Sequence, residues 1–326
     1  MKRDFMNNSN IDVIAFSEKL IGNLEKVIVG KKQVLENIVI ALLSQGHLLI
    51  DDVPGVGKTM LAKSLAKSIG CSFTRIQFTP DMLPSDITGV SIFNQNTREF
   101  EFRPGPLLSQ IVLADEINRA TPKTQSALLE AMEERQISVD GITYILPRPF
   151  MVLATQNPIE YEGTFPLPEA QLDRFIMKIK IGYPGFNDEM EILDLQKIQH
   201  PIDSLEIVSI ETEILQMQDA IKEVYISPAV KKYIVELTRA TRVHPDVYLG
   251  VSPRASLGLY RTSQARAATS GRDYVLPDDV KTLARFVMGH RMIIQPAARL
   301  RNLSSEQIIT EVINSVSVPG GDFNPI

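Results

Sequence analysis

The chain has 326 residues and a net charge of −5, and this acidic balance leaves no basic footprint that favours nucleic acid as a direct ligand. Its length predicts two domains. No apolar run approaches the roughly 20 residues that span a bilayer, and the polar first ten residues predict no signal peptide, so we expect a cytoplasmic protein without membrane insertion.

Strand and helix patterns alternate up to about residue 182. Several of the predicted strands are nearly continuous apolar runs, which are typical of a parallel sheet covered by helices on both faces. They occupy residues 47–51, 72–77, 110–114, 149–155 and 175–181. Thr121 and Pro122 predict the start of a helix over residues 123–134. The single cysteine, Cys71, is expected to be a small buried apolar residue. Residues 1–183 are therefore predicted to form an α/β domain.

Two hairpins interrupt this alternation. Asp140 and Gly141 lie between two short segments of strand character and predict a two-residue turn. A second hairpin is expected over residues 90–102, with its turn at residues 94–96. Neither hairpin helps the core of a parallel sheet, so we interpret both as appendages that contact another molecule.

From about residue 184 the strand signals nearly vanish and amphipathic helices follow. One helix is expected to begin at Asn187 and Asp188. The others are predicted over residues 211–224, 228–241, 253–270, 278–288 and 305–316. We expect residues 184–326 to form a smaller, all-helical second domain.

A glycine-rich segment between a predicted strand and helix has the spacing of a phosphate-binding loop. The candidate nucleotide contacts are Pro54, Gly55, Val56, Gly57, Lys58, Thr59 and Met60. The glycines let backbone N–H groups turn towards phosphate oxygens, Lys58 adds a positive charge for the β- and γ-phosphates, and the Thr59 hydroxyl is a ligand for Mg²⁺. Asp52 stands where such a loop usually begins with glycine, and we expect its side chain to lie away from the phosphate.

A second motif consists of Asp115 and Glu116, which follow the apolar run 111–114. A buried strand that ends in two acids delivers their carboxylates to the carboxyl edge of the sheet. There Asp115 is expected to hold the water shell of Mg²⁺, and Glu116 to activate a water against the γ-phosphate. The two motifs together predict a nucleoside triphosphate hydrolase.

The chain resembles the MoxR family of AAA+ ATPases from Ile28 to Pro319. The resemblance is carried by ordered blocks at residues 29–30, 53–59, 77–89, 102–106, 113–120, 154–158, 163–175 and 252–255. It implies an α/β AAA+ core with a helical lid, ATP as the nucleotide, and assembly into a ring, taken to be a hexamer. It also implies that Val29 and Gly30 lie against adenine.

Three further residues take catalytic roles. Asn157 follows a buried strand and, as sensor 1, would hold the attacking water; the alternative is a capping residue in a loop. The resemblance implies that Arg174 reaches the γ-phosphate of a neighbouring subunit; the alternative is a local ion pair with Asp173 or Glu169. Arg254 lies in the first turn of a helix, where a cation is locally unfavourable. The resemblance makes it sensor 2, brought by the lid to bound nucleotide, and the alternative is a surface arginine.

Other polar residues leave alternatives open. Gln77 ends the second strand and is placed to restrain Glu116 by a hydrogen bond, or only to satisfy backbone groups. Arg119 contacts either the nucleotide or the acids of a neighbouring subunit. Glu133 is expected to lie on a solvated helix end.

A zinc site is not expected, because the four histidines are far apart without ligand spacing; they are His47, His200, His244 and His290.

Three classes of function are compatible with these features. The leading one is an ATP-driven ring that remodels or activates a client protein, often with a partner that contains a von Willebrand factor A domain. A nucleic-acid-directed motor is the second, and the acidic balance counts against it. A non-hydrolysing scaffold is the third, and Glu116, Asn157 and Arg174 argue against it.

Overall fold

The computed structural model describes residues 12–157, 163–195 and 201–319. Pro158, His200 and the first ten residues, which the sequence analysis considered, lie outside the described residues. Five of the described strands form the central sheet: β1 (Leu48–Asp51), β2 (Phe73–Gln77), β5 (Ile111–Asp115), β8 (Met151–Gln156) and β9 (Met177–Ile179). The five predicted strands are thus confirmed, and only the last is clearly shorter than expected.

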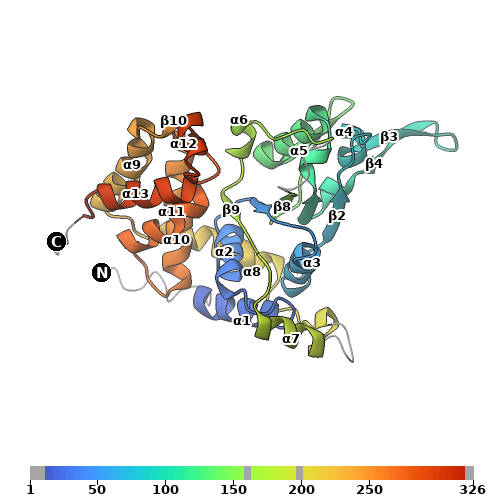
Figure 1. The fold of residues 1–326 in the computed structure, drawn as a ribbon. Coiled ribbons are helices and arrows are strands. Elements are labelled where there is room, and N and C mark those ends of the chain that lie inside the picture. The colour runs from blue at the N-terminus through green and yellow to red at the C-terminus, as the bar shows by residue number, and fades with distance from the viewer. Residues whose placement is uncertain (1–11, 158–162, 196–200, 320–326) are drawn as a thin grey trace.

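The strand order in this sheet is β2-β5-β8-β1-β9, and every neighbouring pair is parallel (Figure 1). All carboxyl ends therefore lie at one edge of the sheet. β8 lies between β5 and β1, so the carboxyl end of β8 is placed between the acid pair and the glycine-rich loop. Open parallel sheets bind ligands at this edge.

Helices cover both faces of the sheet. Successive strand residues point to opposite faces: Ile111 and Leu113 of β5 pack in one core cluster, whereas Val112 and Ala114 pack in another. Besides residues of later helices, the first cluster includes residues of α1 (Val13–Glu25), α2 (Lys32–Leu43) and α3 (Lys58–Ser68). The second includes residues of α4 (Pro84–Thr88) and α5 (Pro122–Glu134).

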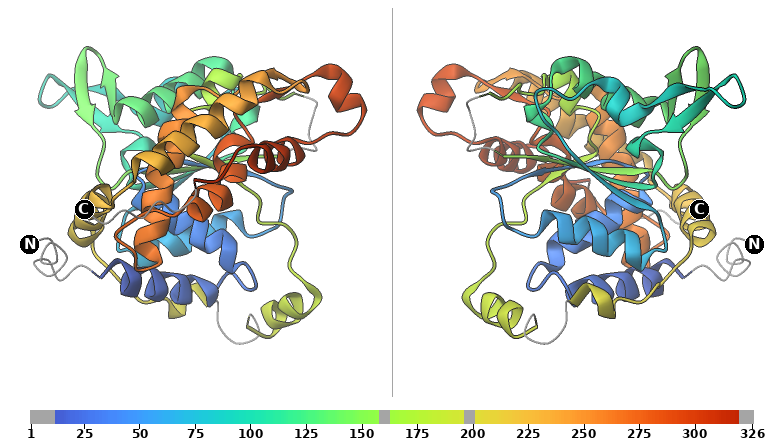
Figure 2. Two further views of the ribbon diagram at one scale, coloured as in Figure 1. Left: turned by 90° about the vertical axis from the view of Figure 1, so that its left-hand side faces the viewer. Right: turned by 90° about the vertical axis from the view of Figure 1, so that its right-hand side faces the viewer.

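Both expected hairpins are present. One is formed by β3 (Gly89–Asn94) and β4 (Glu99–Pro104), the other by β6 (Gln136–Val139) and β7 (Ile142–Ile145). Asp140 and Gly141 form the turn with positive φ angles of 50° and 79°, as a tight hairpin turn requires. The rings of Phe102 and Tyr144 stack at 4.0 Å, so the two hairpins contact each other. Figure 2 shows both projecting from the same side of the molecule.

Short elements connect the hairpins, the sheet and the lid. They are η1 (Pro106–Leu108), η2 (Ile117–Arg119), α6 (Glu169–Leu172), α7 (Phe186–Leu195), η3 (Pro201–Ser204), α8 (Glu211–Ala220) and η4 (Ile221–Glu223). The part from η3 to α8 packs on the α/β domain. Lys67 donates to the carbonyl of Ile202 at 2.8 Å, and Gln218 donates to the carbonyl of Leu42 at 2.8 Å. We therefore propose that the lid proper begins after η4, later than residue 184.

The lid is predominantly helical. Its helices are α9 (Pro228–Val243), α10 (Pro253–Thr269), α11 (Pro277–Met288), α12 (Pro296–Leu300) and α13 (Ser305–Ser315). A short antiparallel pair, β10 (Val247–Leu249) with β11 (Ile293–Ile294), was not expected from the sequence. Ser227, Ser252 and Ser304 cap three of the helices with their hydroxyls. α10 packs on α1 and α2, so the lid shares a continuous apolar core with one face of the α/β domain (Figure 1).

His47 has a structural role at the amino end of β1. Its Nε2 lies 3.1 Å from the carbonyl of Met132, and its Nδ1 accepts from the amide of Val152 at 2.9 Å. Burial lowers the pKa of His47 to about 3, so the ring is neutral. Burial also raises the pKa of the Cys71 thiol to about 12, in agreement with an inert, partly buried residue.

Within the described ranges, no helix is long and apolar enough to cross a membrane. No group of three or more His, Cys, Asp or Glu side chains with metal-binding proximity occurs there either.

Candidate functional site

The glycine-rich loop follows β1 at the carboxyl edge of the sheet and leads into α3. Gly55 and Gly57 have φ angles of +85° and +87°, a region that favours glycine. Gly57 is the residue before α3, so Lys58 and Thr59 lie in the first turn of that helix. The N–H groups at a helix start attract phosphate oxygens, and the loop therefore has the geometry that the sequence predicts.

Lys58 is held at the base of this loop. Its Nζ donates to the backbone carbonyl of Asp52. Burial lowers the pKa of Lys58, while the nearby carboxylates of Asp52 and Asp115 act in the opposite direction. An incoming phosphate would offer the partly buried ammonium group of Lys58 further negative charge.

Asp52 faces the protein, as expected. Its side chain is buried, and Oδ1 accepts from the amide of Val53 at 2.9 Å. Oδ2 accepts from the amides of Ile181 and Gly182 at 2.7 and 2.6 Å. The residue that departs from the usual loop pattern therefore ties the loop to the chain that leaves β9 towards the lid.

Asp115 ends β5 beside the phosphate loop. Its Oδ1 accepts from the hydroxyl of Thr155 at 2.6 Å, and its Oδ2 accepts from Nη2 of Arg75 at 2.6 Å. The metal donors expected from the sequence, the Thr59 hydroxyl and the Asp115 carboxylate, are oxygen ligands of the kind that Mg²⁺ prefers. Neither Thr155 nor Arg75 was expected to take part in the site.

Glu116 follows Asp115 in a left-handed conformation, with a φ angle of +56°. Its amide donates to the Thr155 hydroxyl at 2.9 Å, so Thr155 fixes both acids of the motif. Its Oε2 accepts from Gln77 at 2.8 Å and from Arg119 at 3.1 Å. The expected hydrogen bond between Gln77 and Glu116 is confirmed, and Arg119 contacts Glu116 of its own chain. Thr155 was detectable as a polar residue that directly follows the apolar run of a central strand, residues 151–154.

The other residues that the sequence predicts for the nucleotide site lie near the same edge. Asn157 is buried directly after β8, between the two motif strands as predicted. Val29 is buried, and Gly30 has a φ angle of +71°. A Cβ atom on Gly30 would lie 2.2 Å from the Asp188 carboxylate, so the side chain of this α7 residue lies against the segment expected to contact adenine. Val56 and Met60 pack, partly buried, against the adjoining core.

Arg174 and Arg254 share one partner. Nε of Arg174 donates to Oε2 of Glu133 at 2.7 Å, and Nη2 of Arg254 donates to Oε1 of the same carboxylate. Arg174 is thus not paired with Asp173 or Glu169. Glu133 is exposed near the end of α5 as expected, and it also binds the two arginines. Sequence reasoning missed Glu133 because its partners come from distant segments.

This arginine pair lies at the amino edge of the sheet. Arg174 precedes β9, and the amide of Ile176 donates to the carbonyl of His47, which precedes β1. Lys58 and Glu116 lie at the opposite, carboxyl edge. At about 3.3 Å per residue, strands of this length separate the two edges by roughly 13–20 Å. In this arrangement Arg254 does not reach the phosphate loop of its own chain, and its expected role as sensor 2 stays a prediction.

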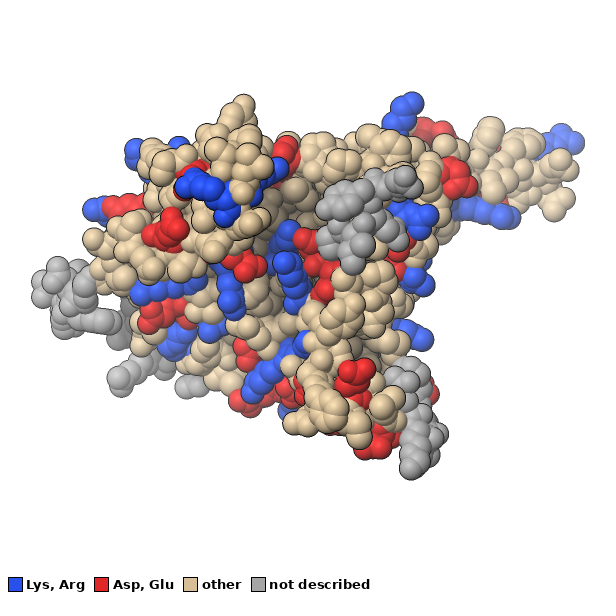
Figure 3. Space-filling model, viewed as in Figure 1, with Lys and Arg blue, Asp and Glu red and all other residues tan. Residues whose placement is uncertain are grey.

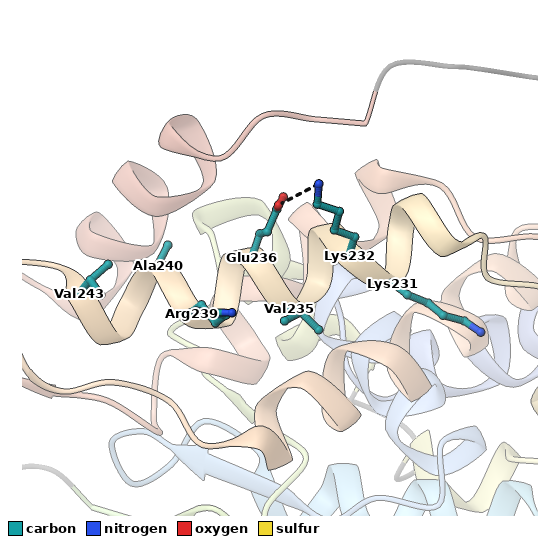
Figure 4. A pocket seen from close by; sticks show the side chains of 7 residues that line it. All are labelled: Lys231, Lys232, Val235, Glu236, Arg239, Ala240 and Val243. Carbon is teal, nitrogen blue, oxygen red and sulfur yellow. Dashed lines mark ion pairs between the residues drawn. The ribbon is translucent and has the colours of Figure 1, made fainter.

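Charged side chains of both signs are interspersed on the face drawn in Figure 3, with basic ones gathered in the hollow between the lid and the α/β domain. A separate surface hollow runs along α9 (Figure 4), where Lys232 and Glu236 form an ion pair at 3.6 Å. It belongs to the lid alone, and none of the candidate site residues lines it.

Comparisons with known proteins agree with this geometry. The model of the ATPase family associated with various cellular activities (AAA) matches residues 47–177, and a model of the AAA lid domain matches residues 239–312. A crystal structure of a protein from Cytophaga hutchinsonii ATCC 33406, assigned as an ATPase, superposes with a TM-score of 0.90 at 38% identity and covers 97% of this chain and 100% of its own. The fold and the site thus define an AAA ATPase with a helical lid, which binds nucleotide and hydrolyses ATP.

Relatives narrow this class to one family. YeaC of Bacillus subtilis (strain 168), an uncharacterized protein, is 54% identical over 92% of this chain and 94% of its own length. Chaperone MoxR1 of Mycobacterium tuberculosis is 42% identical over 93% of this chain and 82% of its own length. Protein MoxR of Methylorubrum extorquens is 30% identical over 90% and 91% of the two chains. The chain belongs to the MoxR family of AAA+ ATPases.

Proposed function

We propose that the protein works as an ATP-driven ring, a hexamer, that remodels or activates a client protein, and that each active site is shared by two subunits. The proposal of a shared site is supported by the distance between its two groups of residues within one chain. Lys58 and Glu116 lie at the carboxyl edge of the sheet, whereas Arg174 and Arg254 lie together at the amino edge, beside Glu133.

Residues of one chain provide the first half of the site. Lys58 and the loop amides would bind the phosphates, while Thr59 and Asp115 would hold Mg²⁺, which would supply positive charge to the phosphates. Glu116 accepts a proton from the attacking water, and Asn157 orients that water. Val29 and Gly30 lie against the base.

The neighbouring subunit provides the second half. Arg174 and Arg254 share one carboxylate in the isolated chain, and a γ-phosphate would offer both guanidinium groups a stronger anion. Such arginines raise the rate of phosphoryl transfer roughly 10³–10⁵-fold. Because neither arginine lies at the phosphate loop of its own chain, hydrolysis would require assembly. Arg254 would link the lid of one subunit to the nucleotide state of the next.

The two hairpins are the proposed contact with the client. Phe100 and Ile145 are 75% and 77% exposed, and Ile142 and Phe93 are also exposed. Apolar side chains gathered on projecting hairpins are typical of an interaction surface. The printed name of the 42% identical relative, Chaperone MoxR1, supports a chaperone-like role. The family resemblance adds a von Willebrand factor A domain protein as a partner.

A mixing experiment tests the shared site. Arg174→Ala should remove the arginine and leave Glu116 intact, whereas Glu116→Gln should remove the base and leave Arg174 intact. Each variant alone should hydrolyse ATP at least roughly 100-fold more slowly than the unchanged protein. Subunits of the two variants combined in one assembly should regain activity, because some interfaces then pair an intact Glu116 with an intact Arg174.

Failure of the mixture to regain activity, with mixed assemblies verified by mass, would contradict the shared site. Lys58→Ala serves as a control, since it should abolish ATP binding, whereas Glu116→Gln should keep it. The ATP-loaded Glu116→Gln protein then serves to retain client proteins for identification.

A further inference from the structure

The segment that carries Arg174 is held by the lid through Arg291. Nε of Arg291 donates to Oδ1 of Asp173 at 2.7 Å. The other guanidinium nitrogens donate to backbone carbonyls of the same segment: Nη2 to Phe175 at 2.6 Å and Nη1 to Ile176 at 3.2 Å. One side chain of the lid therefore fixes the residues on both sides of Arg174.

The same carboxylate also holds the helix that carries Arg254. Oδ2 of Asp173 accepts from the hydroxyl of Ser252 at 2.6 Å. Ser252 is the residue before α10, and its hydroxyl also accepts from the amide of Arg254 at 3.1 Å. Asp173 thus connects directly to the start of the helix on which Arg254 lies.

This cluster is more buried than the arginines that it adjoins. The side chain of Arg291 is 3% exposed and that of Asp173 is 15% exposed, whereas Arg174 and Arg254 are 29% and 46% exposed. A buried ion pair adds little net stability, because desolvation of the two charges offsets their attraction, but its geometry is well defined. Such a pair is suited to holding two segments of the chain in a fixed position relative to each other.

We propose that Asp173, Arg291 and Ser252 form a positioning cluster that holds Arg174 and Arg254 in one fixed arrangement, so that both arginines approach the neighbouring nucleotide together. The proposal rests on the shared site proposed above. None of the three residues touches the nucleotide. Their role is to make the lid and the chain before β9 move as one unit. Arg254 of the lid then keeps its position relative to Arg174.

The test combines variants in mixed assemblies. Asp173→Asn should lower kcat roughly 10–100-fold, the range expected when a reacting group is misplaced by about 1 Å. The KM for ATP should change less than about twofold, because the phosphate loop of the variant is intact. Mixed with Glu116→Gln subunits, which have a sound cluster, Asp173→Asn subunits should regain activity. Mixed with Arg174→Ala subunits, they should not, since both variants then lack a working arginine.

A second buried ion pair of the lid provides a matched control. Arg272 donates to both carboxylate oxygens of Asp279, at 2.7 and 2.6 Å, and the side chain of Asp279 is 5% exposed. Asp279→Asn should lower the melting temperature by a similar amount to Asp173→Asn and leave kcat within about twofold. Equal loss of kcat in the two variants would show that the Asp173 cluster is only structural.

Milder variants keep the proposal testable if Asp173→Asn does not fold. Ser252→Ala removes one hydrogen bond, and Arg291→Lys retains the charge but not the fork that reaches several carbonyl and carboxylate groups. Both should lower kcat and show the same mixing pattern. Normal kcat in all three variants, with Arg174→Ala inactive, would overturn the cluster and leave the shared site standing. Failure of Arg174→Ala and Glu116→Gln to complement would overturn both.

Discussion

Gln77 donates a hydrogen bond from Nε2 to Oε2 of Glu116 across 2.8 Å. The bond links the end of β2 to the residue that follows β5, at the edge where the phosphate loop lies. Arg119 donates to the same oxygen at 3.1 Å. In this state the oxygen that would accept a proton from water is already engaged by two donors of the protein.

Gln77→Leu is expected to raise the basal rate of ATP hydrolysis roughly fivefold. A hydrogen bond of this kind is worth about 1 kcal/mol, and its loss would free Glu116 to act on water. The check is kcat at saturating ATP. A fall in kcat would instead show that Gln77 orients Glu116 for catalysis, and an unchanged kcat with a lower melting temperature would assign it a structural role.

Asp52→Gly, which restores the usual first residue of the loop, is expected to destabilise the protein by about 2–4 kcal/mol. The change removes a buried carboxylate that accepts three backbone hydrogen bonds and leaves the amides of Ile181 and Gly182 without that partner. Asp52→Asn, which keeps one acceptor oxygen, should lose about half as much. Urea unfolding of the two variants measures the difference, and equal stability of all three proteins would refute this role.

Thr155→Val is expected to lower kcat about 10–100-fold and to raise the Mg²⁺ concentration that hydrolysis requires. Valine has the shape of threonine but lacks the hydroxyl that fixes Asp115 and Glu116. Thr155→Ser keeps the hydroxyl and should retain most of the activity. If the two variants behave alike, the methyl group and not the hydroxyl is what matters.

His47 is expected to make the protein less stable in acid. Its folded pKa of about 3 lies below the unfolded value of 6.5, so the unfolded chain binds a proton that the folded chain does not. Stability is therefore retained above about pH 6.5 and lost as the pH falls towards 3, by about 2 kcal/mol from this group at pH 5. His290, whose pKa is also lowered by burial, acts in the same direction. Unfolding by urea at about pH 7 and pH 5 should show a smaller pH effect in His47→Gln.

Replacement of residues 139–142 by a Gly-Ser turn is expected to leave basal ATPase activity and assembly intact and to abolish stimulation by a client. The turn itself is exposed and contributes nothing to the sheet core, whereas Tyr144 beyond it stacks on Phe102 of the other hairpin. The comparison is between ATPase rates with and without client. A shortened protein that no longer forms rings would identify the hairpin as an assembly element.

Local patterns in the sequence predicted most of the fold. The apolar run before Asp115 specified a buried strand, and the glycines before Lys58 specified a tight loop, because both depend on residues close together in the chain. The same is true of the turn at Asp140 and Gly141. Short elements such as β11 and α12 were missed, because an element of only two to five residues is too short to show a periodic pattern.

The site residues that the sequence did not predict are those whose roles depend on contacts between distant segments. Glu133 is 121 positions from Arg254, and nothing near Glu133 in the chain distinguishes it from a surface acid. Thr155 lies 40 positions from Asp115, yet parallel pairing of β5 with β8 brings the two side chains to 2.6 Å.

The sequence by itself determined the class of protein and predicted the residues that would meet the phosphates, because a phosphate loop and a strand that ends in acids work through neighbouring residues. Only the tertiary structure decided where the arginines lie. The position of Arg254 depends on how α10 packs against α1 and α2 and on the buried contacts of Asp173 with Ser252 and Arg291. Those contacts join segments 79 and 118 positions apart, so no local pattern encodes them.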